Sequence, residues 1–368
     1  MLPQNYVTGD YCVGTETFSI IDNERLEVLG PKEGKRKISV RMYYPVEREQ
    51  CTGKEKAAYF SEQKKNALLK AYPLPRKWLK DIETAEYYKN VSHVEGKKFP
   101  LILFNHGYGI YIESNNVLCI ELASHGYVVA SVGHAYEAME NDYDDGSFDV
   151  YDKNINKELY SKHYLKSIIE MLRLNQKKLT PEEAYKEFLT FQDTYCYYTK
   201  GRVPEWKKDN MSVVADLKQR YAQWIDFSKG VGATGHSMGG STAYGLCMNE
   251  EEIVCGISID GVAYGDYAGQ TMTRPFYQIC IKQNYNMETT PLFHTTAPVH
   301  YAIFGNMQHN GFTDMKFFVP IRAMVGKMNG LVMYKHLSNI HIKFFDMYLK
   351  KLPNIELPSG REDGVTYN

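Results

Sequence analysis

The sequence lacks any apolar run of the roughly 18 residues that a membrane-spanning helix needs, and it has almost no excess charge of either sign. Its formal net charge is −1, so no long-range field would draw it to nucleic acid or to an acidic lipid surface. Residues 1–10 also lack the basic and apolar regions of a secretory signal peptide. We therefore expect a soluble, cytoplasmic protein that binds no nucleic acid and does not insert stably into a membrane.

Cysteine is present without a recognisable pattern. The seven cysteines are odd in number, and no pair has C-x-x-C spacing, which argues against both a disulfide framework and a zinc site. Most of them lie in apolar surroundings typical of small core residues, as expected in a reducing compartment. The cysteines are Cys12, Cys51, Cys119, Cys196, Cys247, Cys255 and Cys280.

What the chain does have is enough apolar material for a large core. Hydrophobic residues make up 43% of its 368 residues and aromatic residues 13%. The length suits two domains, or one large α/β domain that carries an insertion.

The order of expected elements favours the second possibility. Two antiparallel strands come first, a mainly helical stretch follows, and short apolar runs then alternate with helical patterns, as in a doubly wound and mostly parallel sheet. The expected strands are 11–21, 36–44, 99–104, 127–132, 231–234, 253–259, 276–282 and 299–304. The expected helices lie within 54–90 and at 113–125, 209–227, 240–248 and 331–351.

Residues 139–205 interrupt this alternation. They open with an acidic stretch and continue with an amphipathic helix marked by Tyr160, Tyr164, Ile168 and Leu172. We predict a core formed by residues 1–138 and 206–368, with 139–205 as a helical cap. Such insertions usually cover the carboxyl ends of the strands, where ligands bind.

The segment Gly235-His236-Ser237-Met238-Gly239 has the G-x-S-x-G pattern of a nucleophile elbow. A strand pattern precedes it and a helix pattern follows, which is the setting that such a turn requires. The pattern alone is common enough to arise by chance, so its interpretation depends on finding the partners that a serine nucleophile needs.

A serine hydroxyl needs a base, and the base needs an acid that fixes its tautomer. His309 follows the 299–304 strand within a few residues and is the best candidate base, with His294 as a rival. Asp260 ends the 253–259 strand and is the favoured acid, with Glu288 as the alternative. Asp266 and Asp314 are more typical of solvated or structural positions.

An oxyanion hole would complete such a site. Its two backbone N–H donors would come from Met238, which follows the nucleophile, and from Tyr108, in the His-Gly loop after the 99–104 strand. The same loop could instead be a plain strand-exit turn.

These motifs together resemble the plasma, type II platelet-activating factor acetylhydrolase family and its bacterial relatives. That resemblance implies an α/β-hydrolase fold, related to dienelactone-hydrolase-like esterases, and assigns the catalytic roles to Ser237, Asp260 and His309. It therefore supports Asp260 over Glu288, and it keeps Tyr108 and Met238 as oxyanion donors. The segments that carry it are 9–14, 40–45, 99–109, 235–240 and 257–261, together with His309, Phe312 and Asp314.

We therefore predict a serine hydrolase that cleaves carboxylic esters and uses neither a cofactor nor a metal. Tyr136, Tyr164 and Trp206, in and beside the cap, are the candidate pocket residues, and a small, short-acyl or phospholipid-like ester is the expected substrate. An amidase, peptidase or acyltransferase would use the same residues, and a binding module on the same fold is the non-enzymatic alternative. The sequence does not predict an oligomeric state.

Overall fold

The computed structural model describes residues 7–30, 33–71, 74–79, 82, 84, 87–155, 157, 164–176 and 179–368, without the side chains of residues 164, 165 and 175. In this part of the chain, eleven strands form one sheet in the order β12-β13-β11-β10-β9-β8-β4-β5-β2-β1-β3. Strands β6 and β7 pair separately. The strands are β1 (Cys12–Leu26), β2 (Lys35–Val46), β3 (Tyr87–Lys89), β4 (Leu101–Asn105), β5 (Val128–His134), β6 (Glu140–Asp142), β7 (Phe148–Val150), β8 (Val231–His236), β9 (Ile253–Ile259), β10 (Phe276–Ile281), β11 (Val299–Phe304), β12 (Gly360–Glu362) and β13 (Val365–Tyr367).

The centre of the sheet is parallel from β5 through β4, β8, β9 and β10 to β11. Antiparallel pairs flank this centre, β1 with β2 and β2 with β5 on one side and β11 with β13 on the other. This arrangement confirms the prediction of a mostly parallel α/β sheet that begins with an antiparallel pair. Because the carboxyl ends of parallel strands share one edge, the loops after β4, β8, β9 and β11 meet there.

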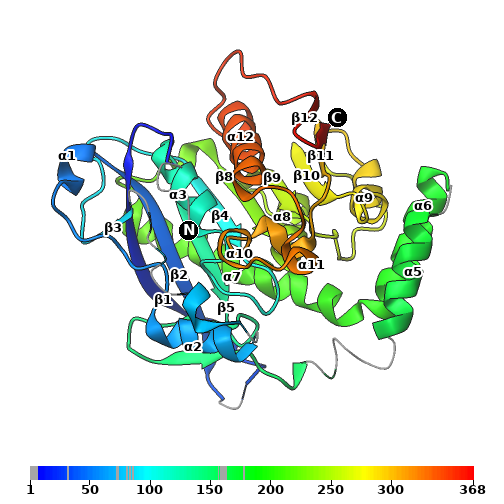
Figure 1. The fold of residues 1–368 in the computed structure, drawn as a ribbon, viewed down its shortest axis with the longest axis horizontal. Coiled ribbons are helices and arrows are strands. Elements are labelled where there is room, and N and C mark those ends of the chain that lie inside the picture. The colour runs from blue at the N-terminus through cyan, green and yellow to red at the C-terminus, as the bar shows by residue number, and fades with distance from the viewer. Residues whose placement is uncertain are drawn as a thin grey trace.

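Helices cover both faces of the sheet (Figure 1). Helices α3 and α12 pack on one face, while α7 and α8 pack on the other. The helices are α1 (Arg48–Cys51), α2 (Glu62–Ala71), α3 (Asn116–Ser124), α5 (Tyr164–Gln176), α6 (Pro181–Tyr195), α7 (Tyr197–Tyr221), α8 (Met238–Asn249), α9 (Tyr285–Thr289), α10 (Met315–Phe318), α11 (Arg322–Val325) and α12 (Gly330–Tyr348).

Strand β4 shows why the sheet has a core on each face. Its side chains alternate, so Leu101 and Leu103 pack toward α7 and α8, while Ile102 and Phe104 pack toward α3 and α12. All four side chains are fully buried. A continuous apolar run of this kind therefore belongs to a strand with helices on both sides.

The expectation of a mainly helical segment at residues 54–90, with a break at Pro73 and Pro75, is wrong at residues 87–89. Helix α2 ends at Ala71, and residues 87–89 form β3, which pairs parallel to β1. The Tyr87 ring is fully buried there and stacks on Tyr43 at a centroid distance of 5.6 Å. Burying an aromatic side chain against a strand outweighs the weak local helix preference of this segment.

The segment 139–205 begins with the β6–β7 hairpin and continues into α5 and α6. These two helices pack on each other, and α5 also packs on α9 while α6 packs on the 3-10 helix Thr290–Phe293. Figure 1 shows them at one end of the molecule. Helix α7 runs without interruption from residue 197 to residue 221, so the expected boundary at 205 falls inside one helix. The division into core and cap stays a prediction, and Tyr160 lies outside the described residues.

The cysteines differ from the expectation in one respect. The sequence argued against a disulfide framework, yet one disulfide joins Cys12 in β1 to Cys51 in α1, while the other five cysteines are free thiols. The pair was missed because its spacing of 39 residues matches no short motif. Disulfides persist mainly in oxidising compartments, so the cellular location of this chain stays a prediction. Among the described residues, no helix is both long and apolar enough to cross a membrane.

Candidate active site

The turn between β8 and α8 holds Ser237 in a strained conformation, with φ at 58° and ψ at −118°. Its N–H donates to the carbonyl of Ile259 at 2.9 Å, which ties the turn to the neighbouring strand. A Cβ at Gly235 would come within 2.5 Å of the backbone of Gly239, and one at Gly239 within 2.0 Å of the Asn105 oxygen. Both glycines are therefore required by close backbone approach.

Asp260 follows β9 directly and also has a positive φ, at 50°. Its side chain is almost fully buried and accepts three hydrogen bonds: from the Ile281 N–H at 2.8 Å, from His309 Nδ1 at 2.6 Å and from Asn284 Nδ2 at 3.3 Å. Burial alone would raise the pKa of this carboxyl, but the donors, His309 first among them, hold it below its usual range. Asp260 is therefore an ionised group that fixes the orientation of His309.

His309 lies in the short 3-10 helix that follows β11, with its side chain about 40% exposed. Because Nδ1 donates to the Asp260 carboxylate, Nε2 is left as the acceptor nitrogen of the ring. The centroid of the His309 ring lies 4.6 Å from that of His236, the residue that precedes Ser237. His294, the rival base, instead packs against Tyr185 at 4.7 Å.

Two other histidines lie beside the turn and are held neutral. Burial lowers the pKa of both His106 and His236 to about 3. His236 donates from Nε2 to the His309 carbonyl at 3.0 Å, so it supports the backbone of the loop that carries His309. Its environment is that of a structural residue beneath the turn.

Glu288, the alternative acid, does not contact His309 but lies behind Asp260. Its side chain is fully buried in α9, and Oε2 accepts from Gln278 Nε2 at 2.6 Å. Burial, followed by the charge of Asp260, raises the pKa of Glu288 well above its ordinary value. The structure thus brings both candidate acids close together, and Asp260 is the one that is hydrogen-bonded to His309.

The loop after β4 crosses directly over the serine turn. A Cβ at Gly107 would lie 3.3 Å from the Cβ of Ser237, so the two segments are in van der Waals contact. Among the described residues, neither the Tyr108 N–H nor the Met238 N–H donates a hydrogen bond. Two unsatisfied N–H groups next to a serine are what binding of an oxyanion would need.

The three expected pocket residues have different surroundings. Trp206 is fully buried in a cluster with Met238 and Val203, and its ring lies parallel to that of Tyr108 at 6.0 Å. Tyr136 has a positive φ of 61°, and its ring packs against Gly30. The side chain of Tyr164 lies outside the described part of the structure. Of the three, Trp206 is the one placed beside the serine turn.

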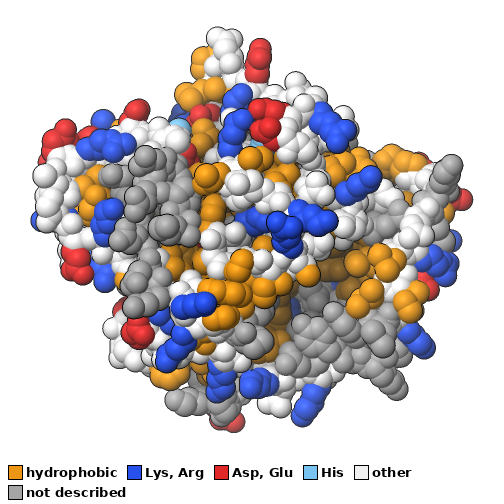
Figure 2. Space-filling view, viewed as in Figure 1, with side chains coloured by type: hydrophobic (Ala, Val, Ile, Leu, Met, Phe, Trp, Pro, Cys, Tyr) orange, Lys and Arg blue, Asp and Glu red, His pale blue; other side chains and the backbone are white. Residues whose placement is uncertain are grey.

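A cleft of about 800 Å³ opens next to the loop that carries His309. Its lining includes Gln308, the residue before His309, and three cations, namely Lys282, Arg322 and Lys327. None of these cations forms an ion pair with a described carboxylate. Figure 2 shows Lys and Arg side chains gathered near α11 on this face, beside a hollow with hydrophobic side chains at its rim. The cleft is therefore electropositive.

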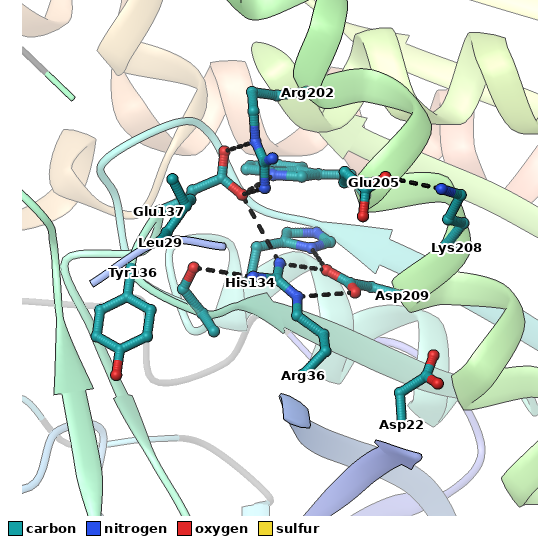
Figure 3. Close-up of polar contacts among 12 residues, drawn as sticks. Asp22, Leu29, Arg36, His134, Tyr136, Glu137, Arg202, Glu205, Lys208 and Asp209 are labelled. Atoms are coloured by element: carbon teal, nitrogen blue, oxygen red, sulfur yellow. Dashed lines mark hydrogen bonds and ion pairs between the residues drawn. The ribbon is translucent and has the colours of Figure 1, made fainter. Parts of the chain in front are cut away.

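A buried ionic cluster beneath the site was not anticipated from the sequence (Figure 3). Asp209 of α7 accepts from Arg36 Nη2 at 2.7 Å, from Arg25 Nη2 at 2.6 Å and from His134 Nδ1 at 2.8 Å. The His134 ring in turn lies 3.1 Å from Asn105 Oδ1, at the start of the loop that carries Tyr108.

A second carboxylate of this cluster is held at the other end of the same loop. Glu137 binds Arg202 through two hydrogen bonds of 2.8 and 2.7 Å, and its backbone carbonyl accepts from the Gly109 N–H at 2.9 Å. Figure 3 shows Glu137 facing Arg202 while the Tyr136 ring points away. Through these contacts α7 secures both ends of the 105–109 loop.

One group of described residues could ligate a metal, and it lies away from Ser237. His336, Glu362 and Asp363 bring their ligand atoms within 4.8 Å of one another, near the C-terminal hairpin. Lys335 forms ion pairs with both carboxylates, at 2.8 and 3.6 Å, so an ammonium group already balances part of their charge. The absence of a cofactor stays a prediction.

A family model and two curated relatives of this chain all bear the same description. A family model described as platelet-activating factor acetylhydrolase, isoform II, matches residues 3–333. The platelet-activating factor acetylhydrolase of Cavia porcellus is 24% identical over 294 residues, which cover 75% of this chain and 61% of that protein. The protein of the same name from Bos taurus is 28% identical over 190 residues, or 50% of this chain and 40% of that one. The chain thus spans about three fifths of the length of the Cavia porcellus protein and two fifths of that of the Bos taurus protein.

Among solved structures, a ferulic acid esterase from Streptomyces cinnamoneus superposes with a TM-score of 0.73 and covers 96% of both chains. The two sequences are 19% identical, so this similarity concerns the fold. The α/β-hydrolase fold expected from the sequence is confirmed, and so is the family resemblance.

Proposed function

The chain belongs to the platelet-activating factor acetylhydrolase isoform II family, and from this membership and the site geometry we propose that it is a serine hydrolase of carboxylic esters. The observation that carries the proposal is the 2.6 Å hydrogen bond from His309 Nδ1 to the buried Asp260, beside the strained turn of Ser237. A base oriented by an ionised acid next to a serine is the arrangement that activates a hydroxyl.

In the first half of the reaction, Ser237 Oγ attacks the ester carbonyl while His309 Nε2 accepts the hydroxyl proton. The oxygen of the tetrahedral intermediate then takes hydrogen bonds from the N–H groups of Tyr108 and Met238. The carbon–oxygen bond to the alcohol breaks, and His309 passes its proton to the leaving oxygen. Asp260 balances the positive charge of the imidazolium throughout. The product of this half-reaction is an acyl group on Ser237.

The second half repeats these steps with water. His309 removes a proton from a water molecule, which attacks the acyl carbonyl, and the acid product leaves as the Ser237 hydroxyl is restored. No step needs a metal or an organic cofactor, because the proton carrier, the nucleophile and the oxyanion donors are all protein groups.

The apolar cluster at the turn supports a preference for a short acyl chain. Trp206, Val203, Met238, Tyr108 and Tyr264 pack together directly beside the serine turn. The electropositive cleft lies next to the loop that carries His309, which protonates the leaving alcohol. A phospholipid-like ester would place a short acyl group at the first surface and the phosphate of its alcohol at the second.

Turnover of p-nitrophenyl acetate by the purified chain tests the proposal. Ser237→Ala should reduce kcat/KM by about 10⁴-fold or more, because the nucleophile is lost. Ser228→Ala, an exposed serine in the loop before β8, is the matched control and should retain wild-type turnover. Equal activity of Ser237→Ala and wild type would refute the mechanism. A series from acetate to octanoate then measures the acyl preference, and anilide substrates distinguish an esterase from an amidase.

A further inference from the structure

The buried acid Glu288 has no role in the mechanism above, yet it touches the triad. Its fully buried carboxyl group lies within interaction distance of the Asp260 carboxyl group. One oxygen, Oε2, accepts from Gln278 Nε2 at 2.6 Å. The other, Oε1, is buried and receives no hydrogen bond from a donor group of any described residue. Such an oxygen is costly to bury unless it carries a proton of its own.

Two carboxyl groups in contact inside a protein do not both ionise, because the like charges would be poorly screened. The donors around the pair decide which one keeps its proton. Asp260 accepts from Ile281, Asn284 and His309, whereas Glu288 accepts at Oε2 from Gln278. The negative charge therefore belongs on Asp260 and the proton on Glu288.

The other groups around Glu288 do not alter this assignment. Tyr264 and the Cys280 thiol face it, and burial raises the pKa of each, so both are neutral. No lysine or arginine contacts Glu288 in the described part of the chain. Beyond Asp260 lie His309 and the neutral His236, each of which interacts with Asp260.

Resting on the proposed function, we propose that Glu288 is a protonated positioning residue whose O–H donates a hydrogen bond to the triad carboxylate of Asp260. This bond gives Asp260 a further donor and fixes the carboxylate plane against His309. It also lowers the basicity of Asp260, so that Asp260 holds the proton on His309 less tightly. The base is then free to accept the serine proton at a lower pH.

Substitution by glutamine and by leucine separates this role from a purely structural one. In Glu288→Gln the amide N–H takes the place of the carboxyl O–H, and its oxygen still accepts from Gln278. This variant should keep kcat/KM within about threefold of wild type, with the acid limb of the pH profile unmoved. Glu288→Leu removes the donor. Its kcat should fall about tenfold, the rate equivalent of one hydrogen bond to a charged group, and its acid limb should move to higher pH.

Glu121 provides the matched control, because it is an equally buried glutamate whose carboxylate accepts from the Thr8 N–H at 2.9 Å, far from the site. Glu121→Leu should lose stability and leave the acid limb unchanged. An infrared difference spectrum of wild type minus Glu288→Gln should contain the band of a protonated carboxylic acid at neutral pH. This spectrum decides the protonation state even where Glu288→Leu does not fold.

Any of three results would overturn the assignment. The first is an acid limb that moves to lower pH in Glu288→Gln, as removal of a negative charge would produce. The others are a Glu288→Leu variant with wild-type kcat and acid limb, and a difference spectrum without the band of a protonated carboxylic acid. The proposed function fails separately. In that case the wild type itself shows no ester turnover that depends on Ser237, whatever the state of Glu288.

Discussion

Replacing Asp209 by asparagine should destabilise the protein more than any exposed carboxylate on the same helix would. Asp209 is fully buried and binds Arg25, Arg36 and His134. Burial alone would raise the pKa of its carboxyl, but the charge of Arg36 holds it well below its ordinary value. Loss of the charge leaves Arg36, only 3% exposed, with Glu27 at 2.8 Å and Glu137 at 3.7 Å as its carboxylate partners.

Removing one partner of a buried ion pair costs about 3–5 kcal/mol, and the remaining contacts of Arg36 with Glu27 and Glu137 favour the lower end of that range. The entropy of unfolding is about 2.1 cal/mol/K per residue, or about 0.8 kcal/mol/K for this chain, so a loss of about 3 kcal/mol lowers Tm by about 4 °C. Because the folded-state pKa of Asp209 is depressed, this contribution is present above about pH 4 and fades as the pH falls further.

Differential scanning calorimetry at pH 7 and at pH 3 measures both effects. Asp216→Asn is the matched control, since Asp216 lies on the same helix but pairs with Arg220 at the surface. That variant should change the free energy of unfolding by less than about 0.5 kcal/mol. If Asp209→Asn melted within 1 °C of Asp216→Asn at pH 7, the buried cluster would not be the anchor of α7 that the contacts indicate.

Three further changes test the fold around the site. Replacing Cys12 and Cys51 together by alanine should lower the free energy of unfolding by about 4 kcal/mol in urea titrations, the loop-closure value for a separation of 39 residues; no loss would show that the pair is not bridged. Gly239→Ala should cost about 3 kcal/mol or more, since its Cβ would lie 2.0 Å from the Asn105 oxygen, and a folded variant of wild-type Tm would contradict the elbow geometry. Gly201→Ala, where a Cβ meets nothing within 4 Å, should instead stabilise the exposed start of α7 by about 0.8 kcal/mol in the same titrations, and a loss would refute that placement.

The parts of the site that could be predicted are those encoded by local patterns. The Ser237 turn lies between a strand and a helix, and Asp260 and His309 each follow a strand, so the parallel sheet alone brings their loops to one edge. The alternation of short apolar runs with helical patterns was sufficient to predict that sheet. Sequence spacing could not show that Glu288 lies behind Asp260, because this depends on how α9 turns back onto β9 and β10.

The parts that could not be predicted depend on contacts between distant segments. Arg36 and Asp209 are 173 positions apart, and either residue alone is typical of a solvated surface. Helix α7 extends through residues assigned to the insert because its amino-terminal turns pack on the core through Trp206, which no local pattern reveals. The pairing of Cys12 with Cys51 is likewise set by the docking of α1 against the β1–β2 pair.

Covalent labelling tests whether Ser237 is the activated nucleophile. A fluorophosphonate reacts with an activated serine, and peptide mass spectrometry then locates the adduct. Assignment of Ser237 as the nucleophile predicts a single adduct on the peptide that contains Ser237, formed in step with the loss of ester turnover. Labelling should be strongly slowed in His309→Ala and absent in Ser237→Ala. Complete loss of turnover without modification of Ser237, or labelling that proceeds at the same rate in His309→Ala, would contradict it.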